Sequence, residues 1–137
     1  MLIKTNMLLG IDVGERRIGL ALADESIRIA VPYDTIEVDG NEVTAIFEII
    51  NREQIDTLVV GYPRNQAGEP TKQTAYVEQF MKQFSDSDAA LIYQDESLTS
   101  VIAEERLQSY GKPYKKGDVD SVAASIILQD YLEQQYA

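Results

Sequence analysis

The chain has 137 residues with a formal net charge of −11, and it contains no Cys, no His and no Trp. This length supports one sizeable hydrophobic core but not two, which predicts a single domain over residues 1–137. The missing residue types exclude disulfides, thiolate nucleophiles, Cys- or His-based metal sites and a Ser-His-Asp triad. Acid–base or metal chemistry must then use carboxylates, which favour Mg²⁺ or Mn²⁺, while the negative charge argues against a general nucleic-acid or membrane coat.

The first part of the chain predicts three strands. Met7–Val13 is a buried apolar run that is too short for a membrane span or a signal segment, so we expect a cytoplasmic protein with no membrane partner. A second apolar run covers Ile18–Ala23, and Ile27–Ile36 carries Ile, Val and Tyr. Pro32 indicates an edge position or a bulge in this third strand. Tight connections between the three strands predict an antiparallel meander.

Helices and strands then alternate. The expected strands are Thr57–Val60 and Ala89–Tyr93, and the expected helices are Asn41–Gln54, a helix with Pro70 in its first turn, Thr99–Tyr110 and Asp118–Tyr131. The order β-β-β-α-β-α-β-α-α predicts an α/β fold with a mixed five-stranded sheet. Three antiparallel strands are followed by parallel additions, with helices on the faces. This element order matches the ribonuclease H-like fold.

Acidic residues lie at the ends of two predicted strands. Asp12 ends an apolar strand, where an ionised carboxylate is costly unless it is paired, hydrogen-bonded or bound to a metal. A strand-end Asp that accepts N–H bonds from the Gly14 turn would also explain it. Asp95 and Glu96 follow the last strand, where ligand sites of α/β sheets gather. Alternation puts these two acids on opposite sides without deciding between them, and a solvated loop pair remains an alternative.

Asp118 and Asp120 open the last predicted helix, and helical phase separates them. Asp118 lies on a polar stripe and is most simply an N-cap. Asp120 lies on the apolar stripe of the helix, with Ala123, Ala124, Ile127 and Tyr131. An acid in the first turn complements the helix dipole, but this does not explain why Asp120 points inward. Acids that converge from strand ends and a helix N-terminus could hold two divalent ions for phosphodiester chemistry.

Four motifs occur in an order and spacing that resemble one known family. They are Asp-Val-Gly-Glu-Arg-Arg-Ile-Gly at 12–19, Val-Val-Gly-Tyr-Pro-Arg-Asn at 59–65, Asp-Glu-Ser-Leu-Thr-Ser at 95–100 and Lys-Gly-Asp-Val-Asp-Ser-Val-Ala-Ala at 116–124. Together they resemble the YqgF-type (RuvX-like) family over roughly residues 7–131. Members of this family are described as Holliday junction resolvases or pre-16S ribosomal RNA nucleases with a ribonuclease H-like fold.

The resemblance implies an activity and a site. It assigns catalysis and the binding of Mg²⁺ or Mn²⁺, as two ions, to Asp12, Glu96 and Asp120, and it selects Glu96 over Asp95. It implies a metal-dependent nuclease acting on structured nucleic acid, in 5′-end maturation of pre-16S rRNA, with ribosomal precursor particles as partners. The alternative substrate is branched DNA, as for a Holliday junction resolvase.

Two departures from the family pattern leave a second function open. Glu15 stands where the family has a small hydroxyl residue, and Ser97 stands where it has Arg, which removes a phosphate contact. These changes motivate a non-catalytic RNA- or ribosome-associated binding module as the alternative. An ATP-binding relative is disfavoured, because such proteins need two domains of this kind around the nucleotide.

Basic residues cluster in the loops beside the predicted site. Candidate substrate-binding residues are Arg16, Arg17, Arg64, Lys112, Lys115 and Lys116. Tyr110 and Tyr114 lie among the lysines and could stack on unpaired bases. A solvated loop is the alternative for the lysine cluster. Many acids fall on predicted helix surfaces, so the charge of −11 is unevenly distributed and still predicts weak nonspecific affinity for nucleic acid.

Overall fold

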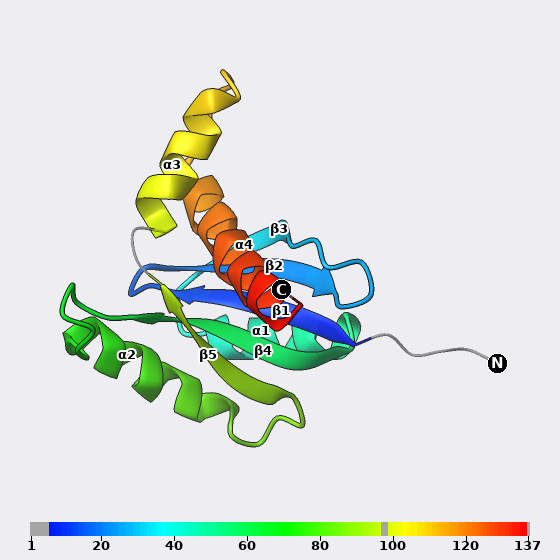
Figure 1. Cartoon of the computed structure of the whole chain (residues 1–137). Coiled ribbons are helices and arrows are strands. Elements are labelled where there is room, and N and C mark those ends of the chain that lie inside the picture. Colours follow the sequence, from blue (N-terminus) through cyan, green and yellow to red (C-terminus); the bar gives the residue numbers. More distant parts are fainter. Residues whose placement is uncertain (1–5, 97–98, 137) are drawn as a thin grey trace.

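The computed structural model describes residues 6–96 and 99–136 (Figure 1). The elements in chain order are β1 (Met7–Val13), β2 (Arg17–Asp24), β3 (Val31–Glu37), α1 (Glu42–Arg52), β4 (Ile55–Pro63), α2 (Lys72–Met81), the 3₁₀ turn η1 (Lys82–Phe84), β5 (Ala90–Glu96), α3 (Thr99–Ser109) and α4 (Lys116–Gln135). None of the helices within these ranges is long and apolar enough to cross a membrane.

The five strands form one mixed sheet in the order β3-β2-β1-β4-β5. β2 pairs antiparallel with both β1 and β3, whereas β4 pairs parallel with β1 and with β5. The predicted meander and the predicted parallel additions are therefore confirmed. Because β1, β4 and β5 run in the same direction, their carboxyl ends meet at one edge of the sheet, which is where Asp12 and Glu96 lie.

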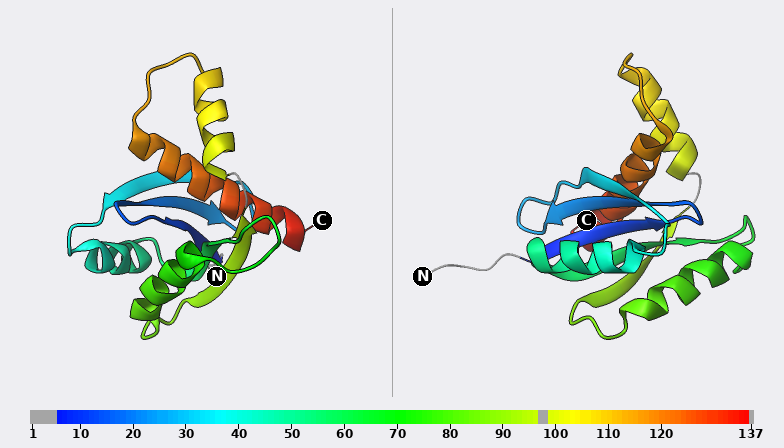
Figure 2. Two further views of the ribbon diagram at one scale, coloured as in Figure 1. Left: turned by 90° about the vertical axis from the view of Figure 1, so that its left-hand side faces the viewer. Right: turned by 180° about the vertical axis from the view of Figure 1, so that it is seen from behind.

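Helices cover both faces of the sheet, so the chain forms three layers (Figure 2). Side chains of α1, α2 and η1 pack on one face in the larger cluster of buried apolar residues. α4 lies on the other face and contacts all five strands. α3 packs on α4 rather than on the sheet, through Ala103, Val122, Ala123 and Ile126, and it projects away from the sheet (Figure 1).

Small residues allow α4 to lie directly on the sheet. Ala21 and Ala23 of β2 face α4 together with Leu8 and Val59. A Cβ atom on Gly10 would lie 2.9 Å from the carbonyl oxygen of Ala124, and one on Gly19 would overlap the carbonyl of Asp120. Glycine weakens a strand interior and is typical of a close backbone approach. The amino-terminal part of α4, around Asp120, is therefore held against the start of β2.

Several boundaries differ from the sequence expectations. β4 spans Ile55–Pro63 rather than Thr57–Val60. The third strand begins at Val31, because the segment before it turns through Arg28 at φ +63°. α2 is capped by Thr71, whose hydroxyl accepts the N–H of Thr74. Pro70 lies outside this helix and forms an isolated bridge with Arg64.

β5 and α4 are both longer than expected. β5 continues to Glu96, because it stays paired with β4 as far as Pro63. α4 begins at Lys116, so Asp118 is not its N-cap. The Asp118 carboxylate instead accepts the backbone N–H of Lys115 at 2.9 Å. The predicted bulge near Pro32 is confirmed, because the β2–β3 register shifts there.

Gly19→Ala should destabilise the protein by about 3 kcal/mol, because the added methyl group forces α4 away from β2. Gly117→Ala is the control, since the nearest atoms to its added Cβ are those of Thr35 at 3.6 Å. That variant should change stability by less than about 1 kcal/mol. Urea unfolding followed by circular dichroism measures both. Equal effects of the two substitutions would contradict the close contact at Gly19.

Candidate functional site

Asp12 lies at the carboxyl end of β1 on the face covered by α4. Its register partner on β2 is Gly19, and the alternation of β1 puts Leu8, Gly10 and Asp12 on this face. The neighbours Ile11 and Val13 point to the opposite core. Asp12 therefore lies near the carboxyl end of an apolar strand, beneath the amino-terminal part of α4.

The pairing of β5 with β4 separates Glu96 from Asp95. Glu96 pairs with Pro63, and a Cβ on Gly61 would lie 2.5 Å from its Oε2 atom. The missing side chain of Gly61 thus provides the space that the Glu96 carboxylate uses. Asp95 pairs with Tyr62 on the opposite face, where its carboxylate accepts a hydrogen bond from Arg64 Nε at 2.8 Å.

Asp120 points toward the sheet from the first turns of α4, as its helical phase predicts. Ala123, Ala124 and Ile127, which share its stripe, are fully buried. The Asp120 Oδ2 atom accepts a hydrogen bond from Arg17 Nε at 2.6 Å, and the two side chains are 22% and 30% exposed. Arg17 is the first residue of β2, so this contact joins residues 103 positions apart.

The charges of Glu96 and Asp120 both affect the pKa of Asp12. The pKa of Asp12 is raised from 3.8 to about 7 by burial first, then by the negative charges of Glu96 and Asp120. The carboxylates are therefore close enough to repel one another. A set of hard oxygen donors with excess negative charge fits a divalent cation such as Mg²⁺ or Mn²⁺.

The acids do not form a ready-made cage around an ion. Within the described ranges, no group of three or more acidic side chains has an arrangement that could hold one metal ion. The contact between Asp120 and Arg17 provides a physical reason, because this carboxylate is directed at a guanidinium. The three predicted acids are thus brought to one edge of the sheet, where Asp120 is hydrogen-bonded to Arg17.

The predicted basic residues lie on two sides of these acids. Arg17, Lys115 and Lys116 line a hollow of about 500 Å³ between β3 and the start of α4. Arg64 lines a second hollow of about 790 Å³ beside Glu96. The remaining candidates, Arg16 and Lys112, are exposed. Among the departures from the family pattern, Glu15 is exposed, and Ser97 lies outside the described residues.

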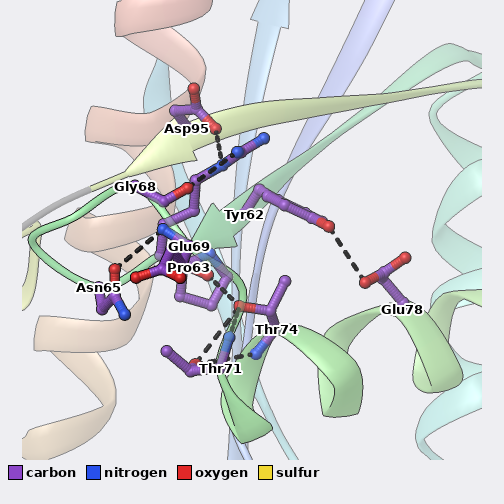
Figure 3. Close-up of polar contacts among 10 residues, drawn as sticks. Tyr62, Pro63, Asn65, Gly68, Glu69, Thr71, Thr74, Glu78 and Asp95 are labelled. Atoms are coloured by element: carbon purple, nitrogen blue, oxygen red, sulfur yellow. Dashed lines mark hydrogen bonds and ion pairs between the residues drawn. The ribbon is translucent and has the colours of Figure 1, made fainter.

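The loop between β4 and α2 carries Asn65, Gly68 and Glu69 (Figure 3), and Arg64 is its first residue after β4. Its guanidinium lies over the Tyr62 ring at 4.8 Å, and its NH1 atom donates to the carbonyl of Gly68 at 3.2 Å. The side chain of Asn65 accepts the N–H groups of Ala67 and Glu69 and closes the turn. The Thr74 hydroxyl donates to the Pro63 carbonyl, so α2 anchors the base of the loop.

Three residues that shape the site were not predicted from the sequence: Gly19, Gly61 and Thr35. Gly19 and Gly61 leave room for Asp120 and Glu96. The Thr35 hydroxyl donates to the Gly117 carbonyl at 2.5 Å and ties β3 to the start of α4. Glycines inside apolar strands were the available signal, since they are typical of a close approach. No sequence signal identified Thr35.

Comparison with known proteins gives consistent matches. The profile of the RuvX family, described as Holliday junction resolvase, matches residues 6–134. A protein of Chloroflexus aggregans named "Putative pre-16S rRNA nuclease" is 43% identical over 92% of this chain and 92% of its own length. A protein of Rickettsia typhi with the same name is 37% identical over 94% of this chain and 86% of its own length.

Solved structures show the same fold at low sequence identity. Thermus thermophilus RuvC in complex with a Holliday junction substrate matches with a TM-score of 0.60 and 15% identity, over 96% of both chains. The fowlpox virus resolvase in complex with Holliday junction DNA matches with a TM-score of 0.56 and 14% identity, over 96% of this chain and 99% of that chain. The expected ribonuclease H-like fold is confirmed, because it is the fold of these RuvC-like neighbours.

The raised pKa of Asp12 predicts a pH-dependent stability. The folded protein binds a proton that the unfolded chain releases, so this stabilisation is complete below about pH 3.8 and is lost as the pH rises through about 7. The wild type should lose this stabilisation and Asp12→Asn should not, so the stability of the variant minus that of the wild type should increase by about 2–4 kcal/mol from pH 4 to pH 8. Urea unfolding in EDTA measures this difference.

Asp88→Asn is the control for removing one carboxylate, because Asp88 is exposed and precedes β5 at the opposite end of the sheet. If the difference in unfolding free energy between Asp12→Asn and the wild type does not change with pH, the raised pKa of Asp12 is contradicted.

Proposed function

Because this chain belongs to the RuvX family, we propose that it is a metal-dependent nuclease that hydrolyses phosphodiester bonds in structured nucleic acid. The observation that carries the proposal is the convergence of Asp12, Glu96 and Asp120. Burial first, and then the negative charges of Glu96 and Asp120, raise the pKa of Asp12 to about 7. Burying like charges together is costly, and a bound cation would offset that cost.

The three carboxylates come from three different elements of the fold. Asp12 and Glu96 project from the ends of β1 and β5, and Asp120 projects from α4, so the ligands approach from two layers. When bound, two Mg²⁺ or Mn²⁺ ions would activate a water molecule and stabilise the charge that develops on the phosphate. The chain itself supplies the rigid sheet edge that fixes the carboxylates and the basic residues that orient the nucleic acid.

The proposed substrate is precursor 16S rRNA, with cleavage in its 5′-end maturation. The relatives at 37–43% identity carry the name pre-16S rRNA nuclease, and they match nearly the whole of this chain. A cytoplasmic role beside ribosomal precursor particles follows from this substrate. The second candidate is a Holliday junction, because the family profile is described as a resolvase.

The basic residues on both sides of the acids suit a nucleic acid strand that crosses the site. Lys115 and Lys116 border the hollow next to α4, and Arg64 borders the hollow next to β5. Each supplies a charge for a phosphate group. The net charge of −11 keeps affinity for other nucleic acids low, so binding requires the metal ions and low salt.

Cleavage should require each of the three acids. We expect Asp12→Asn, Glu96→Gln and Asp120→Asn each to lower the rate by about 100-fold or more, because each removes a metal-binding charge. The assay uses end-labelled pre-16S rRNA fragments with Mn²⁺ or Mg²⁺, and a four-way DNA junction in parallel. Preferential cleavage of the junction would favour the resolvase over the rRNA nuclease.

Asp88→Asn is the control for Asp120→Asn, because it removes the same charge from an exposed position at the opposite end of the sheet. It should retain most of the activity. Full activity in all three acid variants would contradict the proposed site. Salt-sensitive RNA binding by the wild type without cleavage in any metal would instead support a binding module.

Lys116→Gln should weaken RNA binding by about threefold and reduce the dependence of log affinity on log salt by about one unit, because one phosphate contact is lost. Lys82→Gln removes the same charge on the α2 side of the sheet and serves as the control. Fluorescence anisotropy at several salt concentrations measures both variants. Equal slopes for them would show that the hollow at α4 does not contact the nucleic acid.

A further inference from the structure

Arg17 has a different environment from the other basic residues of the site. Its Nε atom donates to Asp120 at 2.6 Å, so it bonds one of the acids that the proposed function assigns to metal binding. Arg16, its neighbour in the chain, is exposed. The two adjacent arginines are therefore used differently: Arg17, at the start of β2, is directed at Asp120, and Arg16, in the turn before it, at solvent.

We infer that Arg17 is a built-in counter-ion that holds Asp120 while the metal is absent and that a divalent cation displaces it. The inference rests on the proposed function, because it takes Asp120 as a metal ligand. Arg17 is a positioning residue in this role, since it acts on Asp120. Once displaced, its guanidinium becomes available to a phosphate group of the nucleic acid.

The ion pair is suited to exchange. Both side chains are partly exposed, at 30% for Arg17 and 22% for Asp120, and pairs of this kind contribute little stability in water. A divalent ion carries twice the charge of a guanidinium and interacts with several carboxylates together. Asp12 and Glu96 lie close enough to attract the same ion, since the negative charge of Glu96 contributes to the raised pKa of Asp12.

Arg17 also has space into which it can move. It lines the hollow of about 500 Å³ that Lys115, Lys116 and Ser121 border. The wall of this hollow also carries the carboxylates of Asp34, Glu37 and Asp118. A guanidinium that leaves Asp120 would add a third cation to the two ammonium groups there, and this third charge would favour the entry of a phosphate group. Arginine binds phosphate through paired N–H donors, which lysine cannot match.

The arrangement couples the binding of metal to the binding of nucleic acid. Without metal, the charge of Arg17 is used by Asp120 and contributes little to phosphate binding. With metal, the same charge faces the hollow. Coupling between two ligands is reciprocal, so nucleic acid should also tighten the binding of the metal.

The first test measures the binding of Mn²⁺ alone by calorimetry, with the full chain and no nucleic acid. Arg17→Gln should bind Mn²⁺ about three- to tenfold more tightly than the wild type, because the competing cation is gone. Arg17→Lys keeps a charge and should restore most of the wild-type affinity. Arg16→Gln is the matched control for the general loss of one positive charge. Circular dichroism checks that each variant is folded.

The outcomes separate the inference from the proposed function. If Arg17→Gln gains no more affinity than Arg16→Gln, or loses affinity, the competition is refuted while metal binding stands. If neither the wild type nor any variant binds Mn²⁺, the proposed function fails and the inference fails with it.

The second test measures RNA binding by anisotropy in EDTA and in Ca²⁺, which keeps the charge of the native ion. Arg17→Gln should weaken RNA binding about threefold or more in Ca²⁺ and should have little effect in EDTA. Arg16→Gln should weaken binding equally in both conditions. An equal effect of Arg17→Gln with and without the cation would overturn the release of Arg17.

Discussion

The close packing of α4 on the glycine- and alanine-containing face of the sheet is the constraint on which the rest of the structure depends. Gly10 and Gly19 allow the helix backbone to contact β1 and β2 directly. The contact buries the stripe of Ala124, Ile127 and Leu128 against the strands. It also fixes the height of Asp120 above the sheet edge, so that a helix residue and a strand residue such as Asp12 interact. Larger side chains on this face would separate the acids.

Gathering acids at this edge works against the stability of the fold. Burial and the charges of Glu96 and Asp120 raise the pKa of Asp12 to about 7, so the metal-free site is strained by repulsion near neutral pH. Arg17 offsets part of this repulsion through Asp120. Strain of this kind persists at functional sites where the surrounding structure holds the groups in position. Here the three-layer packing provides that support.

The distribution of charge is more informative than its sum. The chain carries −11 overall, yet Arg17, Lys115 and Lys116 share one hollow beside the acids and Arg64 borders another. Arg64 is itself paired with Asp95 and stacked on Tyr62, so part of its charge is used within the loop. A nucleic acid strand at this edge would therefore meet Arg17, Lys115 and Lys116 beside the carboxylates.

The sequence by itself determined the order of the elements, the mixed sheet, the inward phase of Asp120 and the restriction to carboxylate chemistry, because periodicity and composition are local properties. It predicted Thr99–Tyr110 as a helix and Met7–Val13 as a strand nearly as the structure has them. Only the tertiary structure decided from geometry that Glu96 faces Asp12 while Asp95 faces Arg64, because this depends on the register of β5 against β4. It also decided that Arg17 pairs with Asp120, a contact across 103 positions that no local pattern encodes.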